Sequence, residues 1–143
     1  MRTNLSKSAR RAGIIVNYLA LLVTIVIPEI IRRIEIPTWI AAATLSGAIF
    51  ITAISYYIVY HRTGLWSFVH RSFDKYDERE AGIALNSLRI GYAIFTVIVL
   101  AIMLVYSVTE IAVNVVLVAG LIFAAHVLPA SVIAWTESII PEN

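Results

Sequence analysis

Four long apolar blocks, separated by shorter polar stretches, dominate the pattern of this chain. They cover residues 12–31, 38–60, 88–108 and 111–135. Each reaches the roughly 20 residues that a helix needs to cross about 30 Å of hydrocarbon. A backbone in lipid must satisfy its own hydrogen bonds, so each block is predicted to be a helix. The predicted fold is all-α, a four-helix transmembrane bundle forming one integral membrane domain over residues 1–143.

The connections between these blocks are short, with one exception. Residues 32–37 join the first two blocks, and residues 61–87 form the only long polar connection. The third and fourth blocks are nearly continuous, and Thr109 and Glu110 are the predicted corner. A single helix over both blocks is the alternative, but it would be about 70 Å long, far more than one bilayer.

Composition supports a membrane protein and indicates its orientation. Of the 143 residues, 60% are hydrophobic and 14% are charged, which is too apolar for a soluble domain of this length. All 11 Lys and Arg residues except Arg32 and Arg33 lie before the first block, in residues 61–87, or at Arg89. Because Lys and Arg favour the cytoplasmic side, both termini and the 61–87 loop are predicted to be cytoplasmic. We expect a multi-pass protein of a bacterial or archaeal plasma membrane (the inner membrane where there are two).

The sequence carries no signature of a known chemistry. With no cysteine, it excludes disulfides, thiolate zinc sites, iron–sulfur clusters and cysteine nucleophiles. Phosphate-binding, zinc-protease, serine-nucleophile and dinucleotide motifs are missing as well. The basic residues are not interleaved with aromatic residues as in a nucleic-acid surface. We therefore expect neither an enzyme nor a cofactor nor a nucleic-acid partner.

Glu29 is an ionisable residue near the outer end of the first block. Ionisable groups inside a span are costly and are functional candidates by default. Pro28 frees a helix carbonyl beside it, so the carboxylate could bind a cation or a proton. Arg32 and Arg33 follow at the spacing of a helical ion pair, which is the simpler interpretation.

His126 is the ionisable residue deepest in the fourth block. It could relay protons, bond a neighbouring helix, or ligate haem with His61 as a second ligand. Asn17 in the first block and Asn114 in the fourth are predicted to bond other helices. Arg89, at the mouth of the third block, is a further candidate polar residue.

Small residues that allow close helix approach are concentrated in two blocks. The second block contains Ala41, Ala42, Ala43, Ser46, Gly47 and Ala48, and the fourth contains Ala119, Gly120, Ala124 and Ala125. Both blocks are predicted to pack inward or to form a seam between subunits.

The loop over residues 61–87 begins with a short amphipathic stretch. Its aromatic residues are expected to insert at the lipid headgroups or to contact a partner. The candidate contact residues are Trp66, Phe68, Arg71, Phe73, Asp77, Glu78 and Glu80. Asp77 and Glu80 have the spacing of a capping box, which predicts a helix running from there into the third block. The clustered acids could alternatively bind a divalent metal.

The run Asp77-Glu78-Arg79-Glu80, with Ser87 and Arg89 following it, resembles a feature of small bacterial multi-pass membrane proteins of unknown function. In those proteins an Asp-Glu-Arg-Glu box precedes a membrane helix. The resemblance implies a bacterial origin and no activity.

Two functions are compatible with this pattern. The first is an accessory or structural subunit that acts through helix packing, as a homo-oligomer or in a larger membrane complex. The alternative is a small oligomeric transporter or channel in which Glu29 and His126 couple transport.

Overall fold

The computed structural model describes residues 5–109 and 112–137, without the side chains of Arg32 and Phe73. Within this part the chain is helical and contains no strand. Its elements are α1 (Lys7–Arg33), α2 (Thr38–Tyr56), the π-helix η1 (Tyr57–His61), α3 (Leu65–Val69), the 3₁₀-helix η2 (Phe73–Lys75), α4 (Glu78–Thr109) and α5 (Val115–Thr136).

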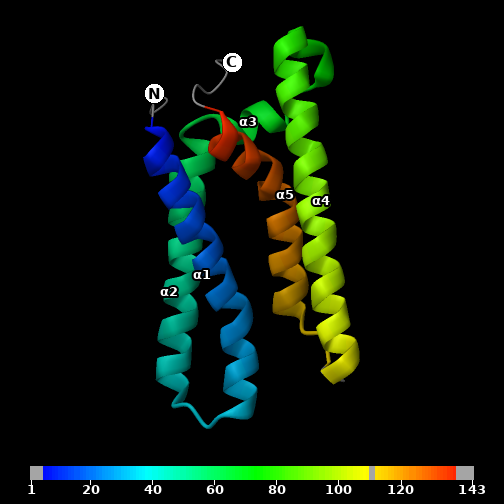
Figure 1. Cartoon of the computed structure of the whole chain (residues 1–143). Coiled ribbons are helices and arrows are strands. Elements are labelled where there is room, and N and C mark those ends of the chain that lie inside the picture. Colours follow the sequence, from blue (N-terminus) through cyan, green and yellow to red (C-terminus); the bar gives the residue numbers. More distant parts are fainter. Residues whose placement is uncertain (1–4, 110–111, 138–143) are drawn as a thin grey trace.

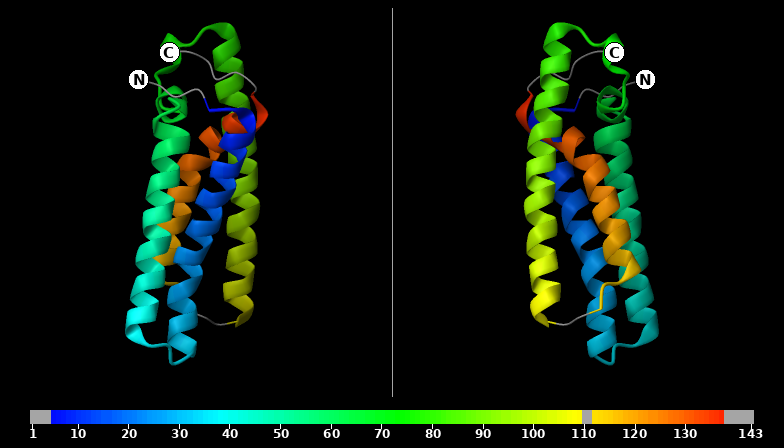
Figure 2. Two further views of the ribbon diagram at one scale, coloured as in Figure 1. Left: turned by 90° about the vertical axis from the view of Figure 1, so that its left-hand side faces the viewer. Right: turned by 90° about the vertical axis from the view of Figure 1, so that its right-hand side faces the viewer.

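Four of these segments are long and apolar enough to cross a membrane, as predicted. They are arranged as two antiparallel hairpins, α1–α2 and α4–α5 (Figure 1). α1 and α5 form the inner pair, since α1 packs on α2 and α5, and α4 packs on α5. In the right-hand view of Figure 2, α5 lies between α4 and α2.

The start of α1, the end of α5 and α3 all lie at one end of the molecule, here named the α3 end (Figure 1). α4 extends beyond the other helices there. Its 32 residues span about 48 Å, against about 30 Å for the hydrocarbon core. The helix is therefore longer than one hydrocarbon layer, and its first turn carries the charged residues Glu78, Arg79 and Glu80.

Local sequence explains most helix boundaries. The Ser6 hydroxyl caps α1 by accepting from the Ala9 amide, 3.2 Å away. Gly64, with a φ of 81°, permits the left-handed turn between η1 and α3. The chain reverses between Thr109 and Val115, so a single helix over the last two blocks is wrong. Glu110, part of the predicted corner, lies outside the described residues.

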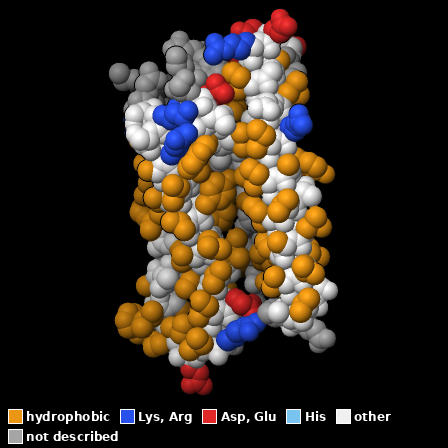
Figure 3. Space-filling view, in the orientation of Figure 1, with side chains coloured by type: hydrophobic (Ala, Val, Ile, Leu, Met, Phe, Trp, Pro, Cys, Tyr) orange, Lys and Arg blue, Asp and Glu red, His pale blue; other side chains and the backbone are white. Residues whose placement is uncertain are grey.

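The main cluster of buried side chains lies at the α3 end. Its core includes Val59, Tyr60, Leu65, Phe68, Val127 and Ile133, each no more than 1% exposed. Beyond Gly91, by contrast, no residue of α4 is buried. Hydrophobic side chains cover the middle of the molecule, and charged ones gather toward its ends (Figure 3).

Candidate functional site

The basic start of α1 lies on the C-terminal end of α5. Lys7 Nζ donates to the Thr136 carbonyl at 2.8 Å, and Arg10 Nη2 donates to the Glu137 carbonyl at 2.8 Å. Arg11 donates to the Trp135 carbonyl from Nε (3.4 Å) and Nη2 (3.0 Å).

These contacts supply hydrogen-bond donors and positive charge to the C-terminal end of α5. A helix leaves its last carbonyls without intrahelical partners, and its C-terminus carries a partial negative charge. α5 has no basic residue in its last turn. Three cations from α1 therefore supply both the donors and the compensating charge. From the sequence, these residues are interpreted only as signals of membrane orientation, because their spacing does not indicate a contact with the end of α5.

A second polar cluster joins three helices inside the bundle. The hydroxyls of Tyr18 on α1 and Tyr60 on η1 lie 3.0 and 2.9 Å from Ser131 Oγ on α5. Ser131 also donates to the Val127 carbonyl at 3.0 Å. A serine hydroxyl has one donor and two lone pairs, so these three bonds satisfy it completely. Nothing in the sequence pattern indicates this cluster, because its three residues lie on segments far apart in the chain.

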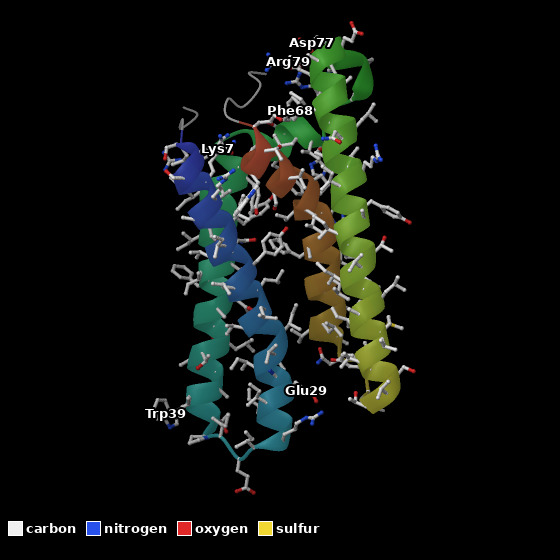
Figure 4. All side chains as sticks on the ribbon, in the orientation of Figure 1. Lys7, Glu29, Trp39, Phe68, Asp77 and Arg79 are labelled. Carbon is white, nitrogen blue, oxygen red and sulfur yellow. The ribbon has the colours of Figure 1, made fainter. Side chains whose placement is uncertain are left out.

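α3 packs into the protein, and the prediction that its aromatic residues insert into lipid or contact a partner is wrong for Phe68. The Phe68 and Leu65 side chains are fully buried, in the same core as Ile133 of α5 and Val59 of η1. Figure 4 shows Phe68 on α3, beside the end of α5. A five-residue helix with two large apolar residues on one face gains more by covering this core than by lying in the headgroups.

Polar contacts fix the chain that connects α3 to α4. Arg71 forms a 3.1 Å ion pair with Glu80, and its guanidinium lies 5.6 Å and 5.3 Å from the ring centroids of Phe68 and Tyr76. The Tyr76 hydroxyl donates to the Phe68 carbonyl. Arg71 and Glu80 therefore bind each other within the chain and do not form an exposed contact surface.

The predicted capping box at the start of α4 is confirmed. The Glu80 amide donates to Asp77 Oδ1 at 2.6 Å, and the Asp77 amide donates to Glu80 Oε2 at 3.4 Å. Trp66 is half-buried and stacks on His70 with ring centroids 3.9 Å apart. Glu78 is exposed in the first turn, and the Phe73 side chain lies outside the described residues. Within the described ranges no group of three His, Asp or Glu side chains could hold a metal ion.

Tyr76 predicts an alkaline limit to the stability of this connection. Burial raises the pKa of the Tyr76 phenol, Arg71 lowers it, and Glu80 raises it, with a net upward shift. The folded state thus holds the proton more tightly than the unfolded chain. The resulting stability is full below about pH 10 and is lost as pH rises through the folded pKa. Stability should fall less steeply above pH 10 in Tyr76→Phe than in the natural chain. Chemical unfolding in micelles at pH 8 to 11 measures this, and equal slopes would contradict it.

Glu29 forms the ion pair that the spacing predicted. Arg33 Nε lies 3.1 Å from Glu29 Oε1, and the Glu29 side chain is 23% exposed. Figure 4 shows Glu29 near the end opposite α3. The Arg32 side chain lies outside the described residues.

The two asparagines have different roles. Asn17 is fully buried and donates from Nδ2 to the Thr52 carbonyl and to Ser55 Oγ, both at 2.9 Å, so it bonds α2 as predicted. Asn114 does not bond another helix. It precedes α5 and caps it by accepting from the Leu117 amide at 2.7 Å. The fourth span therefore begins at Val115 instead of residue 111.

His126 faces away from the other helices. Its ring is exposed, and Nδ1 lies 2.8 Å from the Ile122 carbonyl of its own helix. The prediction that His126 bonds a neighbouring helix is wrong within this chain. Arg89 is likewise exposed, on α4. The described structure therefore does not bring Glu29, His126 and Arg89 into one site.

Comparison with protein-family models, with curated proteins and with solved structures finds no match to this chain.

Proposed function

We propose that this chain is an accessory subunit of the plasma membrane, with the α3 end in the cytoplasm, and that it acts by binding a transmembrane helix of a partner along α5. The distribution of basic residues supports the orientation. Most of the described ones lie at or near the α3 end, whereas Arg33 is the last residue of α1, at the opposite end. The side-chain environment of His126 carries the rest of the proposal.

His126 is an ionisable side chain on the outer surface of a membrane helix. Such side chains normally face a bundle interior or pair with another polar group, because lipid offers them no hydrogen bonds. An exposed imidazole is therefore best explained by a partner that covers it.

The geometry of His126 defines the chemistry of that partner. A carbonyl oxygen can only accept, so Nδ1 of the neutral ring must donate to Ile122. In that tautomer Nε2 carries no hydrogen and can accept a hydrogen bond. Two such rings cannot bond each other, so the partner helix should present an N–H or O–H donor, such as a serine, threonine or asparagine side chain.

The residues around His126 form a continuous outward stripe along α5. Its members are exposed and follow helical spacing: Val115, Val118, Ala119, Ile122 and His126. A cavity of about 280 Å³ lies between α1 and α2, and Phe123 of α5, the neighbour of Ile122 in the chain, contributes to its lining. Ala119 leaves room for a partner backbone to approach closely. A partner helix on the stripe would bury apolar surface and reach Nε2.

Other observations favour this role over transport. Glu29 is held by Arg33, and the hydroxyl of Ser131 has no free donor or lone pair. A transport site needs polar groups that can exchange partners with a substrate.

Position-specific photo-crosslinking in native membranes tests the proposal. A benzoylphenylalanine side chain at position 119 or 122 should give an adduct, and the same group at position 100 or 97 should not. The controls lie at matching depth, because α4 and α5 are antiparallel and Gly91 packs on Pro129. They are also highly exposed, 68% for Val97 and 64% for Leu100, compared with 56% for Ile122.

Variants at His126 distinguish specific binding of a partner helix from random contacts in the membrane. His126→Gln keeps a side-chain acceptor and should retain the adduct, whereas His126→Leu should lower its yield about fivefold, since an interhelical hydrogen bond contributes about 1 kcal/mol. Adducts of equal yield at all four positions, or adducts unchanged in His126→Leu, would refute the partner helix. An adduct with the mass of two copies would identify the partner as this chain.

A further inference from the structure

A second surface, on another side of α5, combines a lipid-sized groove with fixed cations. A cavity of about 310 Å³ lies between α1, α4 and α5 near the α3 end. Its lining is almost entirely apolar and consists of Ile14, Ile90, Ile94, Leu128, Ser131, Val132, Trp135 and Thr136. Of the two hydroxyls in the lining, Ser131 Oγ is already satisfied by Tyr18, Tyr60 and Val127, and Thr136 Oγ1 donates to the Val132 carbonyl. The groove therefore suits a hydrocarbon chain.

The end of this groove toward α3 is basic. Lys7, Arg11 and Ile14 share one face of α1, at intervals of four and three residues. Ile14 lines the cavity, and Lys7 and Arg11 bond the carbonyls of Thr136 and Trp135, which also line it. The two cations are thus held at the cavity mouth. Figure 3 shows Lys and Arg side chains over the upper part of α1, above a predominantly hydrophobic surface.

These cations retain donors for a ligand. An ammonium has three donors and a guanidinium has five. The carbonyl contacts described above use one donor of Lys7 and two of Arg11. The Arg11 guanidinium also lies 4.9 Å from the centre of the Trp135 ring, so it is fixed in orientation. Trp135 is 43% exposed, as expected of an aromatic residue at the headgroup level.

We infer that this groove binds an anionic phospholipid, with an acyl chain between α1 and α4 and the phosphate at Lys7 and Arg11. Charge complementarity selects the occupant: an apolar slot between transmembrane helices with cations at one mouth matches a negatively charged headgroup joined to a hydrocarbon tail. The exposed carboxamide of Asn86, one turn before Ile90 on α4, provides an additional headgroup donor.

A second cavity in the same chain provides the internal comparison. It measures about 420 Å³ and lies between α1 and α2. Its lining includes Ile54 but neither Trp135 nor Thr136, the two residues whose carbonyls hold Arg11 and Lys7 at the first cavity. The larger cavity is therefore expected to take any lipid tail without preference for the headgroup. Ile54 and Ile94 line the two cavities and have nearly equal exposure, 43% and 41%, so the same substitution can be compared at both.

Native mass spectrometry of the full chain in detergent tests the inference, with phosphatidylglycerol and phosphatidylcholine added at equal concentration. The natural chain should retain phosphatidylglycerol preferentially. Lys7→Gln and Arg11→Gln should each lower this retention about fivefold, the effect of one basic residue at a membrane surface. Arg79→Gln removes an equal charge from the first turn of α4, which extends beyond the other helices at the α3 end (Figure 4), and should change retention less than twofold.

Three further variants keep the test independent of folding, because Lys7 and Arg11 also bond the end of α5. Arg11→Lys keeps the charge and should retain the lipid within twofold. Ile94→Trp fills the basic groove and should reduce phosphatidylglycerol binding, whereas Ile54→Trp should leave it unchanged. Equal retention of the two lipids, an equal loss in Arg79→Gln, or binding unaffected by Ile94→Trp would overturn the inference. So would displacement of the lipid by millimolar inorganic phosphate, which would indicate an anion site without a tail groove.

Discussion

Replacing Phe68 with alanine is expected to lower the free energy of unfolding by about 3–5 kcal/mol. The ring is fully buried in the core that joins α3 to α5 and η1, so its removal leaves a cavity lined by side chains that lipid cannot readily fill. Unfolding in mixed micelles of dodecyl maltoside and dodecyl sulfate, followed by circular dichroism, measures the change.

Phe50→Ala is the matched control, because the same ring on α2 is 65% exposed. Its truncation should cost less than about 1 kcal/mol, since lipid or detergent contacts the side chain in the folded state. If Phe68→Ala were as mild as Phe50→Ala, α3 would be a surface helix and the buried arrangement would be incorrect.

Gly120→Leu is expected to separate α1 from α5 and to destabilise the fold by about 1–3 kcal/mol or more. A Cβ atom at Gly120 would approach Ile25 Cγ1 to 2.7 Å, and Leu21 lies just beyond. The rest of a leucine side chain has no space between the two inner helices. The same micelle titration measures the loss.

Gly47→Leu provides the comparison, because no atom lies within 4 Å of a Cβ placed at Gly47. This variant should be neutral or slightly stabilising, as leucine favours a helix over glycine by up to about 1 kcal/mol. A loss equal to that of Gly120→Leu in purified monomer would show that α2 is packed more closely than described. A loss seen only in native membranes would locate a subunit seam on α2.

These two glycines illustrate what the sequence could predict. The apolar blocks were sufficient to predict four helices, because length and composition decide whether a segment can cross a bilayer. The small residues in the second and fourth blocks look alike in sequence, and both were predicted to pack inward. Gly120 and Ala48 do so, while Ala42, Ala43 and Ser46 are exposed. A membrane helix is apolar all round, so its composition does not reveal which face meets protein.

The functional residues also fall into those that could be predicted from the sequence and those that could not. Local pairs were predictable because their spacing is set by one helix, as with Glu29 and Arg33 or Asp77 and Glu80. Contacts between distant segments were not. Neither the Tyr18–Ser131–Tyr60 cluster nor the burial of Phe68 follows from spacing, since both depend on how α5 packs against the first half of the chain. The π-helical turn that carries Tyr60 also has no signal in the sequence.

The bonds from the start of α1 to the end of α5 have a consequence for biosynthesis. They join residues 124 to 129 positions apart, so the acceptors are made long after the donors. At 5–20 residues per second, α1 waits roughly 6–25 s for α5 to be translated. During that interval Lys7, Arg10 and Arg11 lack the α5 carbonyls that they bond in the folded chain. Of the four long helices, α1 is thus made first and is among the last to acquire its final contacts.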